Sequence, residues 1–248
     1  MLPAERHETI LARLARDGTV VSSTLVAELG VSDDTLRRDL RELAGRGLLR
    51  QVHGGAMPLV TATSFAERLD VGADAKAALA VAALPLVADA DLLVLDGGTT
   101  TLELARRLPP SFAGTVLTNS PPIAVALAGH PRAEVVQLGG PLDKESLVTY
   151  GLDTLDMLRS ARSGVCVLGV CSVDPELGVT ATDRQQAEVK RTMVTGARTV
   201  VALATADKLG TAAAWAVAPI TALGHLVTDA PEEATTAYTA AGIAVRRP

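Results

Sequence analysis

The chain is short of aromatic residues and of cysteine. Phenylalanine, tryptophan and tyrosine together make up 2% of its 248 residues, so we expect no surface on which single-stranded bases stack against aromatic rings. Its two cysteines, Cys166 and Cys171, stand five positions apart, without a Cys-x-x-Cys pair or a histidine cluster. We therefore predict buried thiols in a reducing compartment, with neither a disulfide nor a metal site.

Long apolar runs and the common nucleotide-binding motifs are also absent. Although 48% of the residues are hydrophobic, no apolar run reaches the ~20 residues that a membrane span needs. The first residues lack the pattern of a secretory signal, which predicts a cytoplasmic protein. Because neither Gly-x-Gly-x-x-Gly nor the Walker motif Gly-x-x-x-x-Gly-Lys-Ser/Thr occurs, we expect no nucleotide cofactor, and nothing in the sequence indicates another cofactor.

The chain opens with the pattern of a helix-turn-helix domain, which we place at residues 1–57. Apolar residues recur at helical spacing in residues 3–15 and 25–29, and Ser22 begins a run of hydroxyl residues that predicts the N-cap of the second helix. A third helix is predicted from its N-cap, Ser32, through the string SDDTLRRDL. Helix, short turn and helix is the arrangement that lays its last helix in the major groove of DNA.

The exposed face of this third helix predicts contacts to DNA. Leu36, Leu40 and Leu43 make one apolar stripe, and hydroxyl, carboxylate and guanidinium groups lie opposite it or on its flanks. Arginine can read guanine edges with two hydrogen bonds or bind phosphates. The segment Leu48–His53 before Gly54-Gly55 predicts a two-stranded wing with a basic edge. The candidate DNA-contacting residues are Ser22, Ser32, Asp34, Thr35, Arg37, Arg38, Arg41, Arg50 and His53.

The positive charge of the chain is concentrated in the same region. Residues 37–53 hold five arginines and two acids, whereas the whole chain carries a formal net charge of −5. A basic stripe on an acidic protein suits a small footprint on DNA. Because one such helix reads one half-site, we expect a homodimer or homotetramer on double-stranded operator DNA.

After a predicted linker at residues 58–74, the pattern becomes that of alternating strands and helices through residues 75–248. An alanine-rich helix from Lys76 is expected to stop at Pro85, and short apolar strands such as Leu92–Leu95 then alternate with helices. Continuous apolar strands of this kind predict an α/β domain whose mostly parallel sheet is covered on both faces.

Polar residues follow several of these strands. In an open α/β sheet, ligands bind beyond the carboxyl ends of the strands. Glycine amides and threonine hydroxyls at a helix N-terminus suit a phosphate, carboxylate and amide oxygens suit sugar hydroxyls, and a lysine supplies a charge. We therefore predict a site for a phosphorylated sugar or polyol effector, formed by Asp96, Gly98, Thr99, Thr100, Thr118, Asn119, Gly139, Gly140 and Lys208.

Both parts of the chain carry a family resemblance. VSDDTLRRDL, followed by GLLRQVHGGA, resembles the winged helix-turn-helix of the DeoR family of bacterial transcriptional regulators, which implies that Thr35, Arg37 and Arg38 lie at the DNA. The second part resembles the sensor domain of that family through DGGTT, TNS and DKLG, among other stretches. This resemblance implies a fold similar to ribose-5-phosphate isomerase and glucosamine-6-phosphate deaminase. A further matching stretch, EVKR, adds Glu188 and Lys190 to the candidate effector site.

These observations favour a DNA-binding transcriptional regulator. The resemblance implies a repressor of carbohydrate metabolism genes that a phosphorylated sugar or related metabolite releases from its operator. Two other interpretations stay open at this point. The chain could be a sugar-phosphate isomerase or deaminase that carries a DNA-binding domain, with Asp96 and Glu188 as candidate bases. Alternatively, the second domain could serve only to join copies of the chain.

Overall fold

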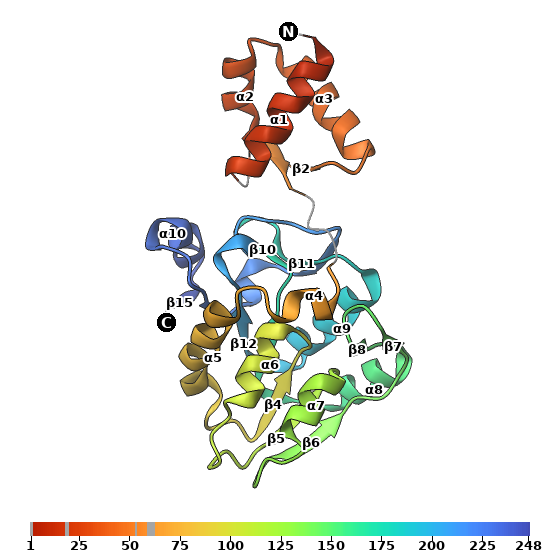
Figure 1. The fold of residues 1–248 in the computed structure, drawn as a ribbon, viewed down its shortest axis with the longest axis vertical. Helices are drawn as coiled ribbons and strands as arrows, with labels where there is room; N and C mark the ends of the chain where they lie inside the picture. The colour runs from red at the N-terminus through yellow and green to blue at the C-terminus, as the bar shows by residue number, and fades with distance from the viewer. Residues whose placement is uncertain (1, 18–19, 53, 59–62) are drawn as a thin grey trace.

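The computed structural model describes residues 2–17, 20–52, 54–58 and 63–248, which form two parts (Figure 1). The first part is a winged helix-turn-helix made of α1 (Pro3–Asp17), β1 (Val20–Val21), α2 (Ser22–Leu29), α3 (Asp33–Gly45), β2 (Arg50–Val52) and β3 (Gly55–Met57). All three helices contribute to one apolar core, in which the predicted stripe of the third helix is confirmed. Its largest members are Ile10, Leu14, Leu25, Leu29, Leu36, Leu40, Leu43 and Leu49.

The start of α2 and the wing differ from the sequence prediction. Ser22 is not an N-cap, because it lies inside the first turn of α2, after the cap residue Val21. Val20-Val21 pairs antiparallel with Gly55-Ala56, and the Ser22 amide donates to the Gly54 carbonyl at 2.6 Å. Strand pairing therefore replaces a side-chain cap here, and the wing is a three-stranded sheet in the order β1-β3-β2 rather than a pair of strands.

A buried ion pair holds α3 against α1. Arg6 of α1 donates to both carboxylate oxygens of Asp39 of α3, at 2.8 and 3.0 Å, and the His7 ring lies 3.2 Å from the same carboxylate. Burial raises the pKa of the Asp39 carboxyl, but the hydrogen bonds from Arg6 and His7 outweigh that effect and leave its pKa below the usual range. The two helices are thus fastened by a charged contact inside an otherwise apolar core.

Part of the segment predicted as a linker is a helix. α4 (Phe65–Leu69) begins with a capping box, in which the Ser64 hydroxyl accepts from the Glu67 amide and the Glu67 carboxylate accepts from the Ser64 amide. The Phe65 ring is buried in the core of the second part. The chain therefore joins the second part at α4 (Figure 1), well before residue 75.

α5 (Ala73–Val87) runs through Pro85, where the sequence predicted its end. A proline cannot donate to the carbonyl of Val81, four residues earlier. Val81 and Pro85 are both exposed, so water can satisfy that carbonyl and the helix continues to Val87.

The second part is an α/β domain around a seven-stranded sheet in the order β15-β14-β12-β9-β4-β5-β6. Every pairing in it is parallel, which confirms the predicted sheet. β4 is followed on one side by β5 and β6, and β9 is followed on the other side by β12, β14 and β15. The strand order therefore reverses between the neighbouring strands β4 and β9. The strands are β4 (Leu92–Leu95), β5 (Thr115–Thr118), β6 (Glu134–Gln137), β9 (Ser163–Gly169), β12 (Ala197–Leu203), β14 (His225–Val227) and β15 (Ala244–Arg246).

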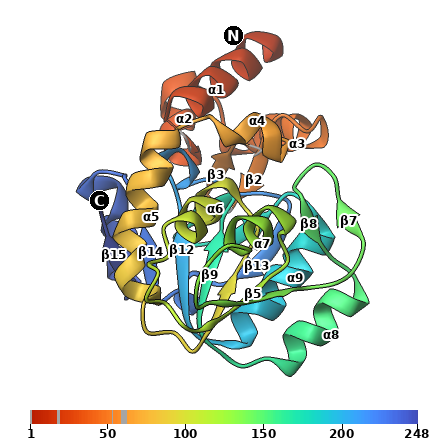
Figure 2. The same ribbon diagram turned by 60° about the horizontal axis from the view of Figure 1, so that its bottom comes forward.

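Helices cover both faces of this sheet (Figures 1 and 2). Successive strand residues alternate between two cores: Leu93 and Leu95 of β4 pack with the first set of helices, whereas Val94 packs with the second. The predicted coverage of both faces is therefore confirmed. The first set is α5, α6 (Thr99–Arg106) and α7 (Pro121–Leu127), and the second is α8 (Leu152–Ser160), α9 (Arg184–Thr195) and α10 (Glu232–Ala240).

Several short elements were not predicted. An antiparallel sheet is formed by β10 (Ser172–Asp174), β11 (Gly178–Ala181) and β13 (Trp215–Ala218), and a hairpin by β7 (Leu142–Asp143) and β8 (Val148–Thr149). Two 3₁₀ turns are η1 (Ala206–Lys208) and η2 (Ile220–Ala222).

The structure tests two further predictions, the burial of both cysteines and the lack of a membrane-spanning segment. Cys166 is buried in the sheet, but Cys171, which was predicted to be buried, is partly exposed beyond the end of β9. In the described parts of the chain, no helix has both the length and the apolar character that crossing a bilayer requires.

Removing the Asp39 carboxylate should destabilise the winged helix-turn-helix, because the buried Arg6 guanidinium then loses its two carboxylate hydrogen bonds. We expect Asp39→Ala to lower the local free energy of unfolding by roughly 2 to 3 kcal/mol. Amide hydrogen exchange of α1 and α3 measures this change. Glu42→Ala removes an exposed acid from the same helix and should leave the exchange rates close to those of the wild type.

The same contact predicts a pH dependence. Because the folded-state pKa of Asp39 is lowered, its contribution is fully present above the unfolded pKa of ~3.9 and is lost as the pH falls through the folded value. The acid-induced rise in exchange should therefore be smaller in Asp39→Ala than in the wild type. Identical exchange in the two proteins at neutral pH would show that the ion pair does not hold α3.

Candidate functional site

The exposed face of α3 carries most of the predicted DNA-contacting groups. Ser32 is the N-cap of the helix, and its hydroxyl accepts from the Thr35 amide at 3.2 Å, so the predicted cap is confirmed. Thr35 is half-buried at the start of this face. The other predicted residues of α3 are exposed, opposite the buried leucines: Asp34, Arg37, Arg38 and Arg41. Together they form one polar face that can meet base edges and phosphates.

The remaining predicted DNA contacts lie outside α3. Arg50, in β2, is half-buried, and its Nη1 atom is covered without a hydrogen-bond partner among the described residues. Ser22 is half-buried at the start of α2. His53 lies outside the described residues. The face of α3 is therefore the strongest candidate for reading DNA.

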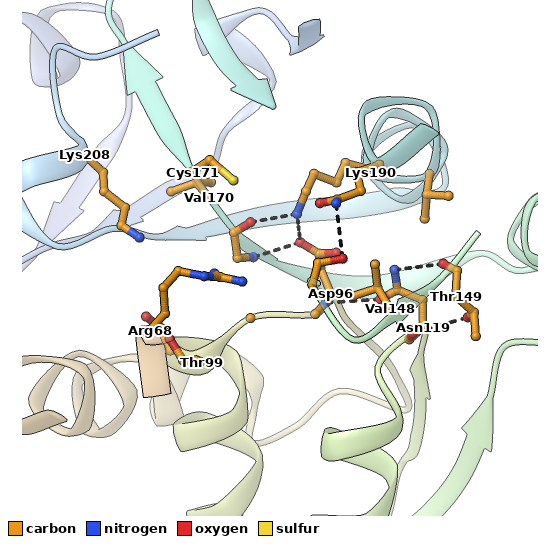
Figure 3. A pocket seen from close by; sticks show the side chains of 17 residues that line it. Arg68, Asp96, Thr99, Asn119, Val148, Thr149, Val170, Cys171, Lys190 and Lys208 are labelled. Carbon is orange, nitrogen blue, oxygen red and sulfur yellow. Dashed lines mark hydrogen bonds and ion pairs between the residues drawn. The ribbon is translucent and has the colours of Figure 1, made fainter. Parts of the chain in front are cut away.

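A cleft opens in the second part where the strand order of the sheet reverses (Figure 3). The turn between β4 and α6 and the end of β9 form its floor, and α4, α9, η1 and the β7–β8 hairpin form its walls. Ligands of open α/β sheets bind at such a position. The cleft thus lies at the edge of the sheet where the sequence predicted an effector site.

A buried ion pair lies at the floor of the cleft. The Lys190 ammonium, on α9, donates to the Asp96 carboxylate and to the Gly169 carbonyl, the latter at 2.7 Å. The Gly169 amide donates to the same carboxylate at 3.1 Å. Burial raises the pKa of the Asp96 carboxyl, and the Lys190 ammonium counteracts that rise. Asp96 is thus bonded within the protein, which differs from its expected role as an acceptor for sugar hydroxyls.

The first turn of α6 presents amides and hydroxyls to the cleft. Thr99 and Thr100 line it, directly after the cap residue Gly98. The first hydrogen bond of the helix runs from the Leu102 amide to the Gly98 carbonyl, at 2.9 Å. The amides of residues 99–101 therefore have no acceptor within the helix. These amides, together with the positive end of the helix dipole, suit an anion.

The β7–β8 hairpin closes one side of the cleft. Val148 packs so closely over Gly97 that a Cβ atom at Gly97 would lie 2.1 Å from Val148 Cγ1. Asn119 ties the same two segments together: its side-chain oxygen accepts from the Gly97 amide at 3.1 Å, and its side-chain nitrogen donates to the Thr149 carbonyl at 3.4 Å. Asn119 therefore lines the cleft while bridging the β4–α6 turn and the hairpin (Figure 3).

Cationic side chains gather at the mouth of the cleft. Lys208, from η1, and Arg68, from α4, extend toward the same space in Figure 3. The Lys76 ammonium, on α5, donates to the Arg68 carbonyl. Burial lowers the pKa of Lys76, and the nearby positive charges of Lys208 and Arg68 lower it further. Two cationic side chains, Arg68 and Lys208, therefore line the same cleft as the first turn of α6.

Four of the predicted effector residues do not line the cleft. The Thr118 hydroxyl is buried and accepts from the Ser120 amide at 3.1 Å. Gly139 and Gly140 lead into the β7–β8 hairpin, and Glu188 is exposed on the far side of α9, about 200° around the helix from Lys190. The predicted residues that do line the cleft are Asp96, Gly98, Thr99, Thr100, Asn119, Lys190 and Lys208.

The cleft also contains residues that were not predicted to belong to the effector site. Arg68 stands in the predicted linker, where no periodicity drew attention to it. The hairpin has strands of two residues, too short for a pattern. Gln186 lies four residues before Lys190 on a predicted helix, so helical spacing could have found it. The missed lining residues with polar side chains are Arg68, Ser146, Thr149, Cys171 and Gln186.

The cleft is narrow. Its free volume is about 40 Å³, which is room for roughly three water molecules. A phosphorylated sugar is larger than this enclosed space. Among the described residues that line the cleft, Asp96 is the one carboxylate, and it is bonded to Lys190. The described lining therefore offers no free carboxylate.

Family comparisons match both parts of the chain. Residues 6–61 match the family described as the DeoR-like helix-turn-helix domain, and residues 72–230 match the DeoR C terminal sensor domain.

Individual relatives match over most of their length. The HTH-type transcriptional regulator GlpR of Haloferax volcanii is 36% identical, over 85% of this chain and 83% of its own. The HTH-type transcriptional repressor GlcR of Bacillus subtilis is 32% identical, over 92% of this chain and 89% of its own. The glycerol-3-phosphate regulon repressor of Escherichia coli is 27% identical, over 93% of this chain and 92% of its own. Among solved structures, ribose 5-phosphate isomerase A of Methanocaldococcus jannaschii is 15% identical, with a TM-score of 0.41 over 55% of this chain and 54% of that one.

Replacing Lys190 should destabilise the α/β domain, because it leaves the buried Asp96 carboxylate without its counter-charge. We expect Lys190→Met to lower the free energy of unfolding by roughly 3 kcal/mol, and the double variant Asp96→Asn/Lys190→Met to recover most of that loss. Urea unfolding followed by the fluorescence of Trp215 measures this domain, because the chain's one tryptophan lies in β13.

The pH dependence of the same variants provides a second check. Without Lys190, only hydrogen bonds from the Gly169 and Gly97 amides oppose the rise that burial causes in the folded-state pKa of Asp96, so the stability of Lys190→Met should fall as the pH rises from ~4 toward neutrality. The double variant lacks the titrating carboxyl and should not show this slope. If Lys190→Met were as stable as the wild type across this range, the pair would not be what holds the floor of the cleft.

Proposed function

Because this chain belongs to the DeoR family of helix-turn-helix transcriptional regulators, we propose that it represses genes of carbohydrate metabolism and leaves its operator when a phosphorylated sugar or polyol binds the cleft between β4 and β9. Two relatives support the proposed mode of action, since both are named repressors, one of them of a glycerol-3-phosphate regulon.

One observation carries the choice of ligand. Arg68, Lys208 and the N-terminus of α6 converge on one space, and the single carboxylate of the described lining is already engaged by Lys190. The described lining therefore has more cationic than anionic side chains, which suits a phosphoryl group. The hydroxyls of Thr99 and Ser146 lie beside it and can meet the hydroxyls of a sugar.

We propose no catalytic role for the cleft. Isomerisation of a sugar phosphate requires a base that can reach a carbon-bound proton. Asp96 is 1% exposed and bonded to Lys190 and Gly169, and Glu188 faces away from the cleft. Turnover of ribose 5-phosphate or glucosamine 6-phosphate by the purified protein would contradict this assignment.

Release from DNA requires the effector to bind the operator-free form more tightly than the operator-bound form. A hundredfold difference between the two affinities corresponds to about 2.7 kcal/mol of coupling. We expect a homodimer or homotetramer on the operator, because α3 reads one half-site.

The polar face of α3 predicts a loss of DNA affinity when its arginines are removed. We expect Arg38→Ala to cost about 1 to 3 kcal/mol on the specific site and to relax base preference there, because a bidentate contact to a base is lost. Fluorescence anisotropy measures the affinity of each protein for a duplex DNA that the wild type has selected from a random-sequence pool. The control is Arg132→Ala, which removes an exposed arginine from the α/β domain and so tests the effect of losing one positive charge alone. Unchanged affinity in an Arg37→Ala/Arg38→Ala double variant would rule out α3 as the reading helix.

The cleft predicts variants that bind DNA but do not respond. We expect Lys208→Ala to keep the operator affinity of the wild type and to need roughly five- to a hundredfold more effector for release, because a charge-assisted contact of about 1 to 3 kcal/mol is lost. Glucose 6-phosphate, fructose 6-phosphate and glycerol 3-phosphate are the probes, with thermal shift for binding and anisotropy for release.

Lys144→Ala removes an exposed lysine from the β7–β8 turn and is the control for this variant. Release of Lys208→Ala at the same probe concentration as the wild type would place the effector elsewhere.

A further inference from the structure

The β7–β8 hairpin is a wall of the cleft with a buried second strand and an exposed turn. The floor residues Asp96, Gly98 and Lys190 are buried, whereas the turn of the hairpin is exposed at Lys144 and Glu145. Its two strands pair with each other and stand outside both larger sheets. The base of the hairpin is fixed, because the Thr149 amide donates to the Asn119 carbonyl at 2.7 Å, whereas its exposed turn is held by polar contacts from Gln186 that a ligand in the cleft can replace.

The turn of the hairpin is held in a strained conformation by contacts that reach into the cleft. Leu147 has a φ of 52°, the one positive value at a non-glycine residue in the described chain. Gln186 of α9 fastens the turn, since its side-chain nitrogen donates to Asp143 Oδ2 at 2.9 Å and to Ser146 Oγ at 3.1 Å. Gln186 and Ser146 also line the cleft, so a ligand there competes for the groups that hold the turn.

α4 is bonded to the same hairpin. The Phe65 amide, at the start of α4, donates to the carbonyl of Glu145 at 2.6 Å. The other end of α4 carries Arg68, whose side chain lines the cleft and whose carbonyl accepts from Lys76. α4 is also the first helix that follows the winged helix-turn-helix along the chain. One short helix therefore contacts the cleft, the hairpin and the segment that leads to the DNA-binding domain.

We propose that the β7–β8 hairpin and α4 shift as one unit when a phosphorylated sugar enters the cleft, and that this unit transmits effector binding to the winged helix-turn-helix. The inference rests on the proposed function and specifies how its two sites communicate. The sugar displaces Val148 from Gly97, and the phosphoryl group draws Arg68 toward Lys208. Both movements act on α4, because the bond from Phe65 to Glu145 joins it to the hairpin.

The buried ring of Phe65 provides the test. Phe65→Ala removes the anchor that seats α4 on the α/β domain, and it replaces no residue that lines the cleft or lies on the face of α3. The quantity to measure is the coupling factor, the ratio of operator dissociation constants with and without saturating probe, for glucose 6-phosphate, fructose 6-phosphate and glycerol 3-phosphate. We expect this factor to fall to within about twofold of one, while the affinity for operator alone and the thermal shift with probe alone both persist.

Leu69→Ala is the matched control, because Leu69 lies on the same helix but is 36% exposed. It should keep the coupling factor of the wild type. A second variant, Ser64→Ala/Glu67→Ala, removes the capping box without touching the core and should also lower the factor, so the test does not depend on the folding of Phe65→Ala. In the wild type, hydrogen exchange of residues 64–70 and 142–149 should change together when the probe is added.

The outcomes separate this inference from the function on which it rests. A wild type that none of the probes releases from DNA would overturn the proposed function and this inference with it. A wild type that is released, together with α4 variants that are released equally well, would overturn the inference alone. Exchange that changes in residues 142–149 but not in residues 64–70 would also overturn it.

Discussion

An ammonium and a carboxylate buried side by side at the reversal point of the sheet determine the shape and the charge of the ligand cleft. Lys190 comes from α9, Asp96 follows β4, and both bond to the backbone of Gly169 at the end of β9. Either charge buried alone would cost several kcal/mol, so these three elements are stable in this place only together. The pairing fixes where α6 begins, and it also neutralises the one carboxylate of the described lining. The cations at the mouth are left to attract a ligand.

The DNA-binding part also contains a buried pair of an acidic and a basic side chain, Asp39 and Arg6. Asp39 is next to Arg38 in the sequence, yet its carboxylate turns inward to Arg6 instead of neutralising the exposed arginines of α3. The acid orients the helix against α1, and the outer face keeps its positive charge for DNA. In both parts, one acidic residue is buried against a base from a distant segment of the chain.

Sequence patterns predicted the features that depend on periodicity and strand ends. The stripe of leucines in α3, the parallel sheet and the position of the cleft at the carboxyl edge all follow from residue spacing. What escaped prediction depends on contacts between distant segments. Arg6 and Asp39 are 33 residues apart, and Lys190 and Asp96 are 94 apart, so no local pattern reveals either pair. Arg68 was hidden for another reason: α4 has five residues, too few for a helical period to show.

The two outer strands of the main sheet limit how copies of this protein can associate. β6 begins at the exposed Glu134, and β15 ends at the exposed Arg246. Beyond β15, Arg247 folds back and donates from Nε to the Ala230 carbonyl at 2.9 Å. Short edge strands with charged side chains resist pairing with a strand from another molecule. The sheet is therefore protected against growing into a continuous intermolecular aggregate.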